Sequence, residues 1–238
     1  MKRYVSLEEI SDGKLYTAND MVKADCLGCQ GCSRCCHEMG DTILLDPCDI
    51  WRFQKGLGKD AQTLLAENVI ALRVVDGVIV PHIKMQPVNT KALKAPVLQT
   101  ANNEEIEEKC PFLDEQGWCT VHAFRPGFCR LFPLGRYYEG EGFKYFLQKS
   151  ECDHPKAKVR ISKWLDLPDL PKYESFVLTW HQIQKQVEEL CQENQEESFG
   201  RNLNMFQLKT FYLLPYDGEA DFYEQFEKRL AEFRKIVP

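Results

Sequence analysis

The sequence has no uninterrupted apolar stretch of about 18 residues, the length that a helix needs to cross a membrane. Near the N-terminus, Glu8, Glu9 and Asp12 fall where a secretory signal peptide would need its apolar segment. From these two absences we expect a cytoplasmic protein with no membrane partner.

An excess of positive charge is also missing. The chain has 30 Lys and Arg against 36 Asp and Glu, a formal net charge of -6 and a pI near 5.5. Nonspecific affinity for nucleic acids comes from many Lys and Arg that neutralise phosphates, so we expect no nucleic-acid partner. Phosphate-binding glycine loops, H-E-x-x-H pairs and nucleophile elbows are absent too, which leaves no recognised catalytic motif outside the cysteines.

Cysteine, in contrast, is abundant: the 238 residues include 11 cysteines. Disulfides are rare in the cytoplasm, and an odd number of cysteines cannot pair completely within one chain. With 44% hydrophobic residues, a chain of this length can bury a core without cross-links. The cysteines therefore indicate metal binding.

Five cysteines are concentrated in the run Cys26-Leu-Gly-Cys29-Gln-Gly-Cys32-Ser-Arg-Cys35-Cys36. The two glycines favour a loop, because glycine permits the positive φ values with which a backbone wraps around a small ion. A structural zinc usually takes four ligands, so five nearby thiols indicate two metals or a polynuclear cluster. The run also contains the ferredoxin-like spacing C-x2-C-x2-C-x3-C, although His37 replaces the proline that follows it there. Spacing leaves zinc and iron-sulfur both open.

Local patterns predict an α+β fold: a small irregular cysteine-rich domain with short β-hairpins, plus a helical C-terminal region. Asp46-Pro47-Cys48-Asp49 is typical of a helix start, and a second helix is expected over residues 61–68. Asp76-Gly77 between two β-branched runs predicts a hairpin over residues 72–80. Turn residues within 110–122 predict a second hairpin that brings Cys110 and Cys119 together. A strand is expected over residues 143–148.

Helical periodicity dominates after residue 155. Apolar residues recur at steps of three and four over residues 175–191 and 221–236, which predicts two amphipathic helices. We therefore divide the chain into an N-terminal lead-in (1–25), a cysteine-cluster metal-binding domain (26–155) and a helical C-terminal extension packed on it (156–238).

Two further segments accompany the cysteine run: Cys110-Pro-Phe-Leu and Arg125-Pro126-x-x-Cys129-Arg130-x-Phe132-Pro133. Together with C-x-x-C-x-x-C-C, they resemble the YkgJ-type cysteine-cluster family, whose members are regarded as zinc- or iron-chelating. The resemblance covers roughly residues 26–155. It implies eight metal-binding thiolates: Cys29, Cys32, Cys35, Cys36, Cys110, Cys119, Cys129 and Cys152. Many members carry Tyr where this chain has His122, which weakens any requirement for a phenol there.

The resemblance leaves Cys26, Cys48 and Cys191 unassigned, the last most simply packed on its amphipathic helix. Positive side chains beside the expected ligands are candidates to balance the thiolate charge: Arg34, Lys109, Arg125 and Arg130. His37 and His122 are weaker candidates for ligands, and Asp49 is more simply a helix cap than a group that orients a ligand.

Three functions are compatible with these residues. The first is a metal-binding protein that chelates zinc or iron, including an iron-sulfur cluster, through the eight thiolates. The alternative is an iron-sulfur-dependent enzyme that modifies a protein or a small molecule, since some flagellin lysine methylases share a similar cysteine cluster. A third is a redox sensor in which Cys35-Cys36 or a spare cysteine reacts and releases the metal.

Overall fold

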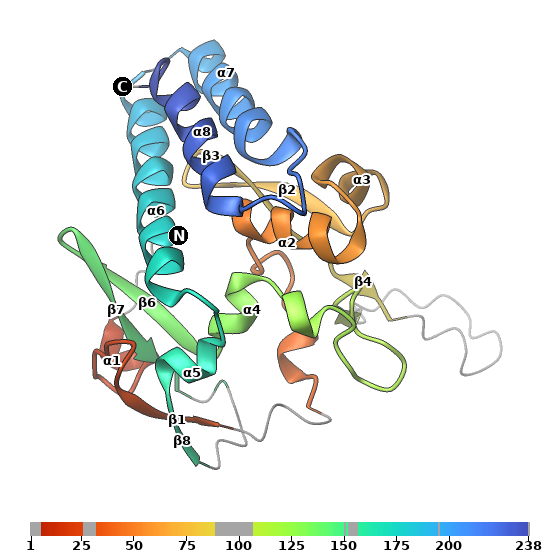
Figure 1. Ribbon diagram of the computed structural model, residues 1–238, viewed down its shortest axis with the longest axis vertical. Coiled ribbons are helices and arrows are strands. Elements are labelled where there is room, and N and C mark those ends of the chain that lie inside the picture. The colour runs from red at the N-terminus through yellow and green to blue at the C-terminus, as the bar shows by residue number, and fades with distance from the viewer. Residues whose placement is uncertain are drawn as a thin grey trace, which may run out of the picture.

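The computed structural model describes residues 6–25, 32–88, 107–149, 151, 157–194 and 196–237. It combines helices with small antiparallel strand pairs, and the C-terminal region is helical (Figure 1). The α+β fold with short hairpins is therefore confirmed.

The first described segment takes part in this fold. It holds a short helix, α1 (Leu7–Ile10), and strand β1 (Met21–Asp25). Strand β1 pairs antiparallel with β8 (Ala157–Arg160), which comes after the cysteine region in the chain, and the two lie side by side in Figure 1. The predicted lead-in and the start of the predicted C-terminal extension are thus hydrogen-bonded to each other.

Helix α2 (Pro47–Leu57) begins where the sequence predicts. The Asp46 carboxylate accepts a hydrogen bond from the N–H of Asp49 at 2.9 Å, and the Asp49 side chain bonds the N–H of Asp46 at 3.1 Å, a reciprocal capping box. Gly58 ends the helix in the left-handed region, at φ 68°. The second expected helix is α3 (Ala61–Ala66), shorter than the predicted range.

The Asp-Gly hairpin is confirmed as β2 (Ile70–Val75) and β3 (Val78–Ile83). Asp76 and Gly77 both have positive φ, 52° and 83°, as a two-residue hairpin turn requires. A smaller pair, β4 (Gln86–Pro87) with β5 (Glu108–Lys109), follows.

The second predicted hairpin is wrong as a pair of strands. Residues 110–122 form a turn with a single β-bridge between Leu113 and Cys119, and the 3-10 helix η3 (His122–Phe124) begins directly afterwards. His122 already belongs to η3, so the second arm leaves the extended conformation and the ladder ends.

The middle of the chain continues with helix α4 (Gly127–Leu131) and the hairpin β6 (Leu134–Glu139) and β7 (Gly142–Leu147). Strand β7 confirms the strand predicted over residues 143–148. Helix α5 (Ile161–Leu165) follows β8.

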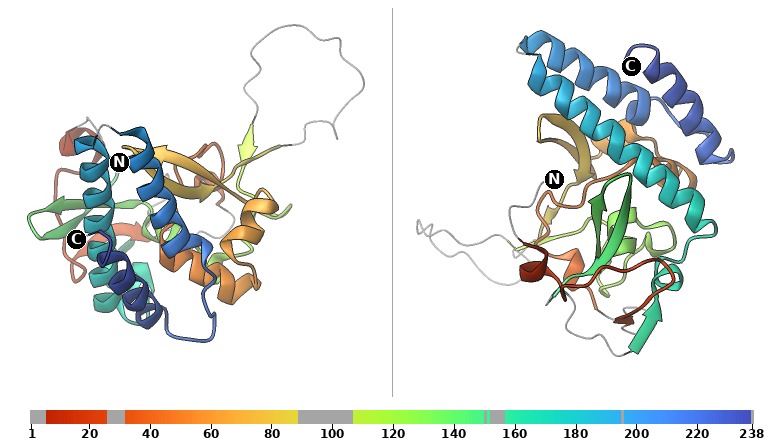
Figure 2. Two further views of the ribbon diagram at one scale, coloured as in Figure 1. Left: turned by 90° about the horizontal axis from the view of Figure 1, so that it is seen from above. Right: turned by 90° about the vertical axis from the view of Figure 1, so that its left-hand side faces the viewer.

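The C-terminal region contains α6 (Leu170–Glu193), α7 (Glu197–Leu208), the π-helical turn η4 (Lys209–Leu213) and α8 (Phe222–Arg234). Both predicted amphipathic helices are present. Helices α6 and α7 lie side by side (Figure 2), and α8 contacts both through aromatic rings, Phe226 on Phe176 and Phe233 on Phe206. Aspartates cap α6 and α8: Asp169 accepts from the N–H of Lys172 and Asp221 from that of Glu224.

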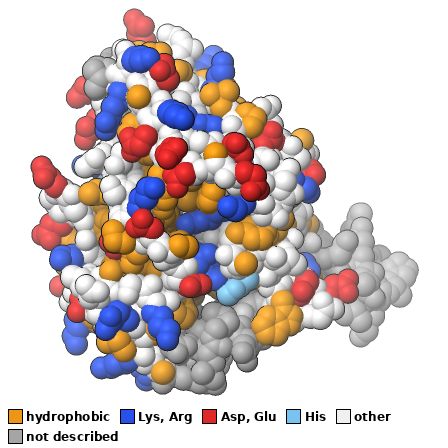
Figure 3. Space-filling model, in the orientation of Figure 1, with side chains coloured by type: hydrophobic (Ala, Val, Ile, Leu, Met, Phe, Trp, Pro, Cys, Tyr) orange, Lys and Arg blue, Asp and Glu red, His pale blue; other side chains and the backbone are white. Residues whose placement is uncertain are grey.

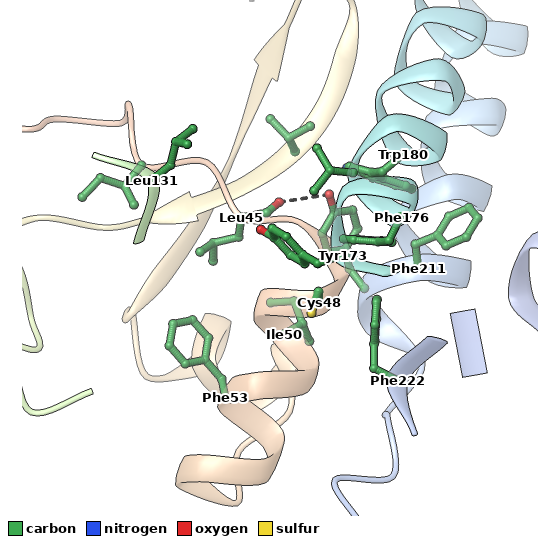
Figure 4. Packing of buried hydrophobic residues seen from close by; sticks show 14 of the residues in the cluster. Leu45, Cys48, Ile50, Phe53, Leu131, Tyr173, Phe176, Trp180, Phe211 and Phe222 are labelled. Atoms are coloured by element: carbon green, nitrogen blue, oxygen red, sulfur yellow. Dashed lines mark hydrogen bonds between the residues drawn. The ribbon is translucent and has the colours of Figure 1, made fainter. Parts of the chain in front are cut away.

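One hydrophobic core joins β1, the two longer hairpins and the helices from α2 to α8. In its densest part, Phe176 of α6 packs edge-on against Phe222 and Phe226 of α8, with ring centroids 4.9 and 4.8 Å apart. Helix α2 contributes Cys48, Ile50 and Phe53 to the same core; Cys48 and Ile50 lie toward the C-terminal helices, whereas Phe53 points away from them and packs on Phe112 (Figure 4).

On the face seen in Figure 3, acidic and basic side chains are interspersed. Within the described part of the chain, none of the helices combines the length and apolar content that crossing a membrane requires.

Candidate metal centre

Two segments that lie far apart in the sequence hold the first three thiols of the site. Cys35 and Cys36 lie in the 3-10 helix η1 (Arg34–Cys36), and the carbonyl of Cys36 accepts a 2.7 Å hydrogen bond from the N–H of Cys110. The N–H of Glu38 donates to the carbonyl of Glu108 at 3.0 Å, which extends the pairing. The backbone hydrogen bonds therefore place Cys36 and Cys110 on adjacent segments of the chain.

Cys119 joins this group through the turn that follows Cys110. The single bridge between Leu113 and Cys119 closes the turn, and the N–H of Thr120 donates to the carbonyl of Phe112 at 2.8 Å. The predicted approach of Cys119 to Cys110 thus occurs without strands.

Cys129 lies on α4, which the buried Arg130 side chain fixes in place. Arg130 donates to the carbonyls of Leu165 and Asp166 at 3.1 and 3.0 Å and to that of Ala123 at 3.1 Å. These bonds tie α4 to α5, so Arg130 positions the element that carries a thiol. Burial lowers the pKa of this guanidinium to about 10.

The five thiols of Cys35, Cys36, Cys110, Cys119 and Cys129 lie within one another's electrostatic reach. The hydrogen bond from the Cys36 thiol lowers the pKa of Cys35 to about 7, and the same bond, followed by burial, raises the pKa of Cys36. Burial raises the pKa of Cys110 to about 11, and it also raises the pKa values of Cys119 and Cys129. Without metal these four raised pKa values keep the thiols protonated, so metal binding must release protons.

The remaining cysteines divide into three groups. Cys32 is described and exposed, whereas Cys29 and Cys152, both predicted ligands, lie outside the described residues with Cys26. Cys48 is 2% exposed in the hydrophobic core, and the Cys191 sulfur accepts from the amide of Asn204. All eight cysteines of the described segments are free thiols.

The described side chains do not by themselves form a complete coordination sphere. Among them, no three Cys, His, Asp or Glu residues converge closely enough to hold an ion. The donor set nevertheless fits zinc or iron, since both bind thiolates and five thiols gather here. Cys35, Cys36, Cys110, Cys119 and Cys129 would hold the metal on this side of the site.

The histidines and arginines near the thiols have specific partners. Burial raises the pKa of Cys119, and the positive charge of Arg125 opposes this rise; at Cys35 the same charge adds to the lowering of the pKa by the Cys36 hydrogen bond. Arg125 also donates to the ring of His122 and to its carbonyl, the latter at 3.0 Å. His37 Nδ1 lies 3.8 Å from Glu107 Oε1. Both residues line a hollow of about 450 Å³ that Cys35 also lines. Arg125 is thus placed to balance thiolate charge, as predicted, whereas Arg130 acts as a structural anchor.

A second cluster of polar side chains, around Asp49, corresponds to none of the sequence motifs. Asp49 caps α2 and also accepts from Arg52 Nη1 at 2.9 Å and from the N–H of Gly127 at 2.8 Å. Asp46 and Asp49 are both raised in pKa by burial, Asp46 to about 7. In the sequence, the only indication of this buried polar cluster is the pair of aspartates at the start of one helix. Gly127, which bonds Asp49, is remote in sequence.

Five thiols thus gather on short irregular segments that pack against a helical region. A family model described as CxxCxxCC, "putative zinc- or iron-chelating domain", matches residues 28–153. The chain belongs to this family, and its metal is zinc or iron. No significant match was found among curated proteins or among solved structures.

Proposed function

We propose that this protein chelates zinc or iron through eight thiolates, and that the bound metal organises the irregular segments of residues 26–155. The proposed ligands are Cys29, Cys32, Cys35, Cys36, Cys110, Cys119, Cys129 and Cys152. The gathering of five of these thiols from three separate segments carries the proposal.

Burial supports a structural role for the metal. Thiols with raised pKa values gain little from ionising alone, but a metal cation replaces the protons and removes the desolvation cost of the thiolates. Binding free energy then becomes folding free energy. A reducing compartment, the cytoplasm, suits the free thiols.

The decisive experiment is elemental analysis with an optical spectrum on protein purified without oxygen. Two zinc ions per chain and no colour would indicate two four-cysteine sites, since structural zinc takes about four ligands. Iron with stoichiometric sulfide and broad absorption near ~400 nm would indicate a cluster. Protein that is fully folded and carries neither metal would refute the proposal.

Substitutions test the ligand assignment. Cys110→Ser should lower the metal content, because serine does not supply a thiolate. Cys191→Ser is the matched control, since Cys191 is bonded to Asn204 on the C-terminal helices and should leave metal content unchanged. Equal metal content in both variants would contradict the role of Cys110.

A further inference from the structure

A large cavity lies beside α4 and is separate from the recess beside Cys35. Its volume is about 710 Å³, and its walls come from α6, the β6–β7 hairpin, β3 and the starts of α2 and α4. Phe132 lines both hollows and stands between them. Cavities of this size accommodate small organic molecules.

One end of the cavity presents hydrogen-bond donors that have no partner. Arg136 Nε and Gln184 Nε2 are buried, and neither makes a hydrogen bond in the part of the chain that the structure describes. An unpartnered buried donor is costly, most of all on a charged group. Arg136 is held in place by ring contacts, with its guanidinium carbon 5.7 Å from the Tyr173 ring centroid and 5.6 Å from that of Phe143.

Arg136 differs from the neighbouring Arg52 in its pairing. Arg52 contacts the Asp49 carboxylate at 2.9 Å, whereas the side-chain partners of Arg136 are the uncharged phenols of Tyr173 and Tyr138, and it forms no ion pair among the described residues. An external carboxylate would satisfy Arg136, and Gln184 could donate to the same group.

A carboxylate of the protein faces the same space. Asp49 is already occupied by Arg52 and Gly127, while Asp46 Oδ1 accepts only the N–H of Asp49 at 2.9 Å among the hydrogen bonds of its side chain. Gly127 keeps this corner open, because a Cβ there would lie 3.5 Å from Asp46 Oδ2 and 2.2 Å from the Tyr173 hydroxyl. Asp46 thus offers an acceptor to a cation.

Much of the remaining lining is apolar and aromatic, and Asp76, Lys185 and Glu188 also line the cavity. Val80, Phe146, Val177 and Trp180 supply apolar surface, and the His181 ring stacks on Tyr138 with centroids 3.6 Å apart. A ligand therefore meets donors, an acceptor and an apolar wall within one enclosure.

We propose that this cavity binds a free amino acid with an apolar side chain, its carboxylate on Arg136 and Gln184, its ammonium group on Asp46 and its side chain against the apolar wall. This site goes beyond the proposed chelation of metal, which uses the cysteine thiols, because none of the described cysteines lines the cavity.

The test is isothermal titration of the metal-loaded protein with L-phenylalanine, L-leucine and two fragments of phenylalanine. The fragment 3-phenylpropanoate lacks the ammonium group, and phenethylamine lacks the carboxylate. We expect saturable binding of one amino acid per chain, with each fragment at least about tenfold weaker, because each loses one charge-assisted hydrogen-bonding group. Fragments that bind as tightly as phenylalanine, or failure of both amino acids to bind at millimolar concentration, would overturn the proposal.

Substitutions assign each end of the ligand. Arg136→Met should weaken phenylalanine and 3-phenylpropanoate and leave phenethylamine unchanged. Asp46→Asn, which keeps the helix cap, should weaken phenylalanine and phenethylamine and leave 3-phenylpropanoate unchanged. Unchanged phenylalanine affinity in a folded Asp46→Asn variant would refute the site.

Gln184→Met provides a variant of similar size that removes only a donor, and Gln182→Met on the exposed side of the same helix is its control. We expect Gln184→Met to weaken phenylalanine binding and Gln182→Met to leave it unchanged. Metal content measured in parallel should stay at the wild-type level in every variant, so that failure of this proposal is distinguishable from failure of metal chelation.

Discussion

At the scale of single residues, Gly127 shows how a missing side chain shapes the molecule. An added Cβ would lie 2.2 Å from the Tyr173 hydroxyl, and Tyr173 is 1% exposed, with the Arg52 guanidinium 5.1 Å from its ring centroid. The ring cannot swing aside, so we expect Gly127→Ala to destabilise the protein by about 1–3 kcal/mol. Urea denaturation would measure this change.

Two variants control that measurement. Gly142→Ala should leave stability nearly unchanged, since nothing lies within 4 Å of its added Cβ. Tyr173→Phe in the Gly127→Ala background removes the clashing oxygen and should restore part of the loss. Equal stability of Gly127→Ala and Gly142→Ala would contradict the clash.

Asp46 gives a pH-dependent prediction. Burial raises its pKa from 3.8 to about 7. The folded state therefore holds this proton more tightly than the unfolded state, so the stabilising contribution is full below about pH 4 and is lost as the pH rises through about 7. Relative to Asp46→Asn, the wild type should become less stable between pH 4.5 and 7.5.

The matched control is Asp60, the cap of α3. The N–H of Thr63 lowers the pKa of Asp60, so its contribution is present above its ordinary value of 3.8 and is lost only as the pH falls below that value. Asp60→Asn should show no trend relative to wild type over pH 4.5 to 7.5. Metal ligation is common to all three proteins and cancels in the comparison, so a flat Asp46→Asn difference would rule out the raised pKa.

The residue scale also shows where prediction from sequence ends. The cap formed by Asp46 and Asp49 is predictable, because both partners lie within four positions. The bond from Gly127 to Asp49 and the approach of Arg136 to the same region depend on the fold, and no local pattern indicates them. The family motif identifies the cysteines, but not which of them the fold brings together.

At the scale of elements, local signals succeed where one turn decides the structure. Asp76-Gly77 predicts its hairpin because the turn alone demands two positive φ values. The segment 110–122 has similar turn residues, yet the onset of η3 at His122 limits its ladder to one bridge. The pairing of β1 with β8 joins segments more than 130 residues apart, so sequence periodicity could not predict it.

The packing of α8 leads to a prediction for this element. Phe226 is 1% exposed, and its ring centroid lies 4.8 Å from that of Phe176 and 5.7 Å from that of Phe211. Phe226→Ala should lower the free energy of unfolding by about 3–5 kcal/mol, because a large core side chain is replaced by a cavity. Ile236→Ala, at a position 66% exposed, should change it by less than about 0.5 kcal/mol. Urea denaturation followed by circular dichroism compares the two, and similar losses would refute the packing argument.

At the scale of the whole molecule, the hydrophobic core includes residues on both sides of the two predicted domain boundaries, after residue 25 and after residue 155. Phe53 of α2 and Ile83 of β3, within the predicted cysteine domain, belong to the same hydrophobic cluster as Trp180 and Phe226 of the C-terminal helices. A composition change at residue 155 therefore marks a change of secondary structure within a shared core. We infer that the cysteine region and the C-terminal helices unfold together.

This inference is tested by unfolding the metal-loaded protein in urea with two probes. Metal-thiolate absorption follows the cysteine region, and far-ultraviolet circular dichroism follows mainly α6, α7 and α8. A shared core predicts that the two transitions coincide, and that a chelator moves both to lower urea concentration, because metal bound only to the folded state stabilises every part that unfolds with it. Loss of absorption at low urea with the helices intact would instead show that residues 156–238 fold as an independent unit.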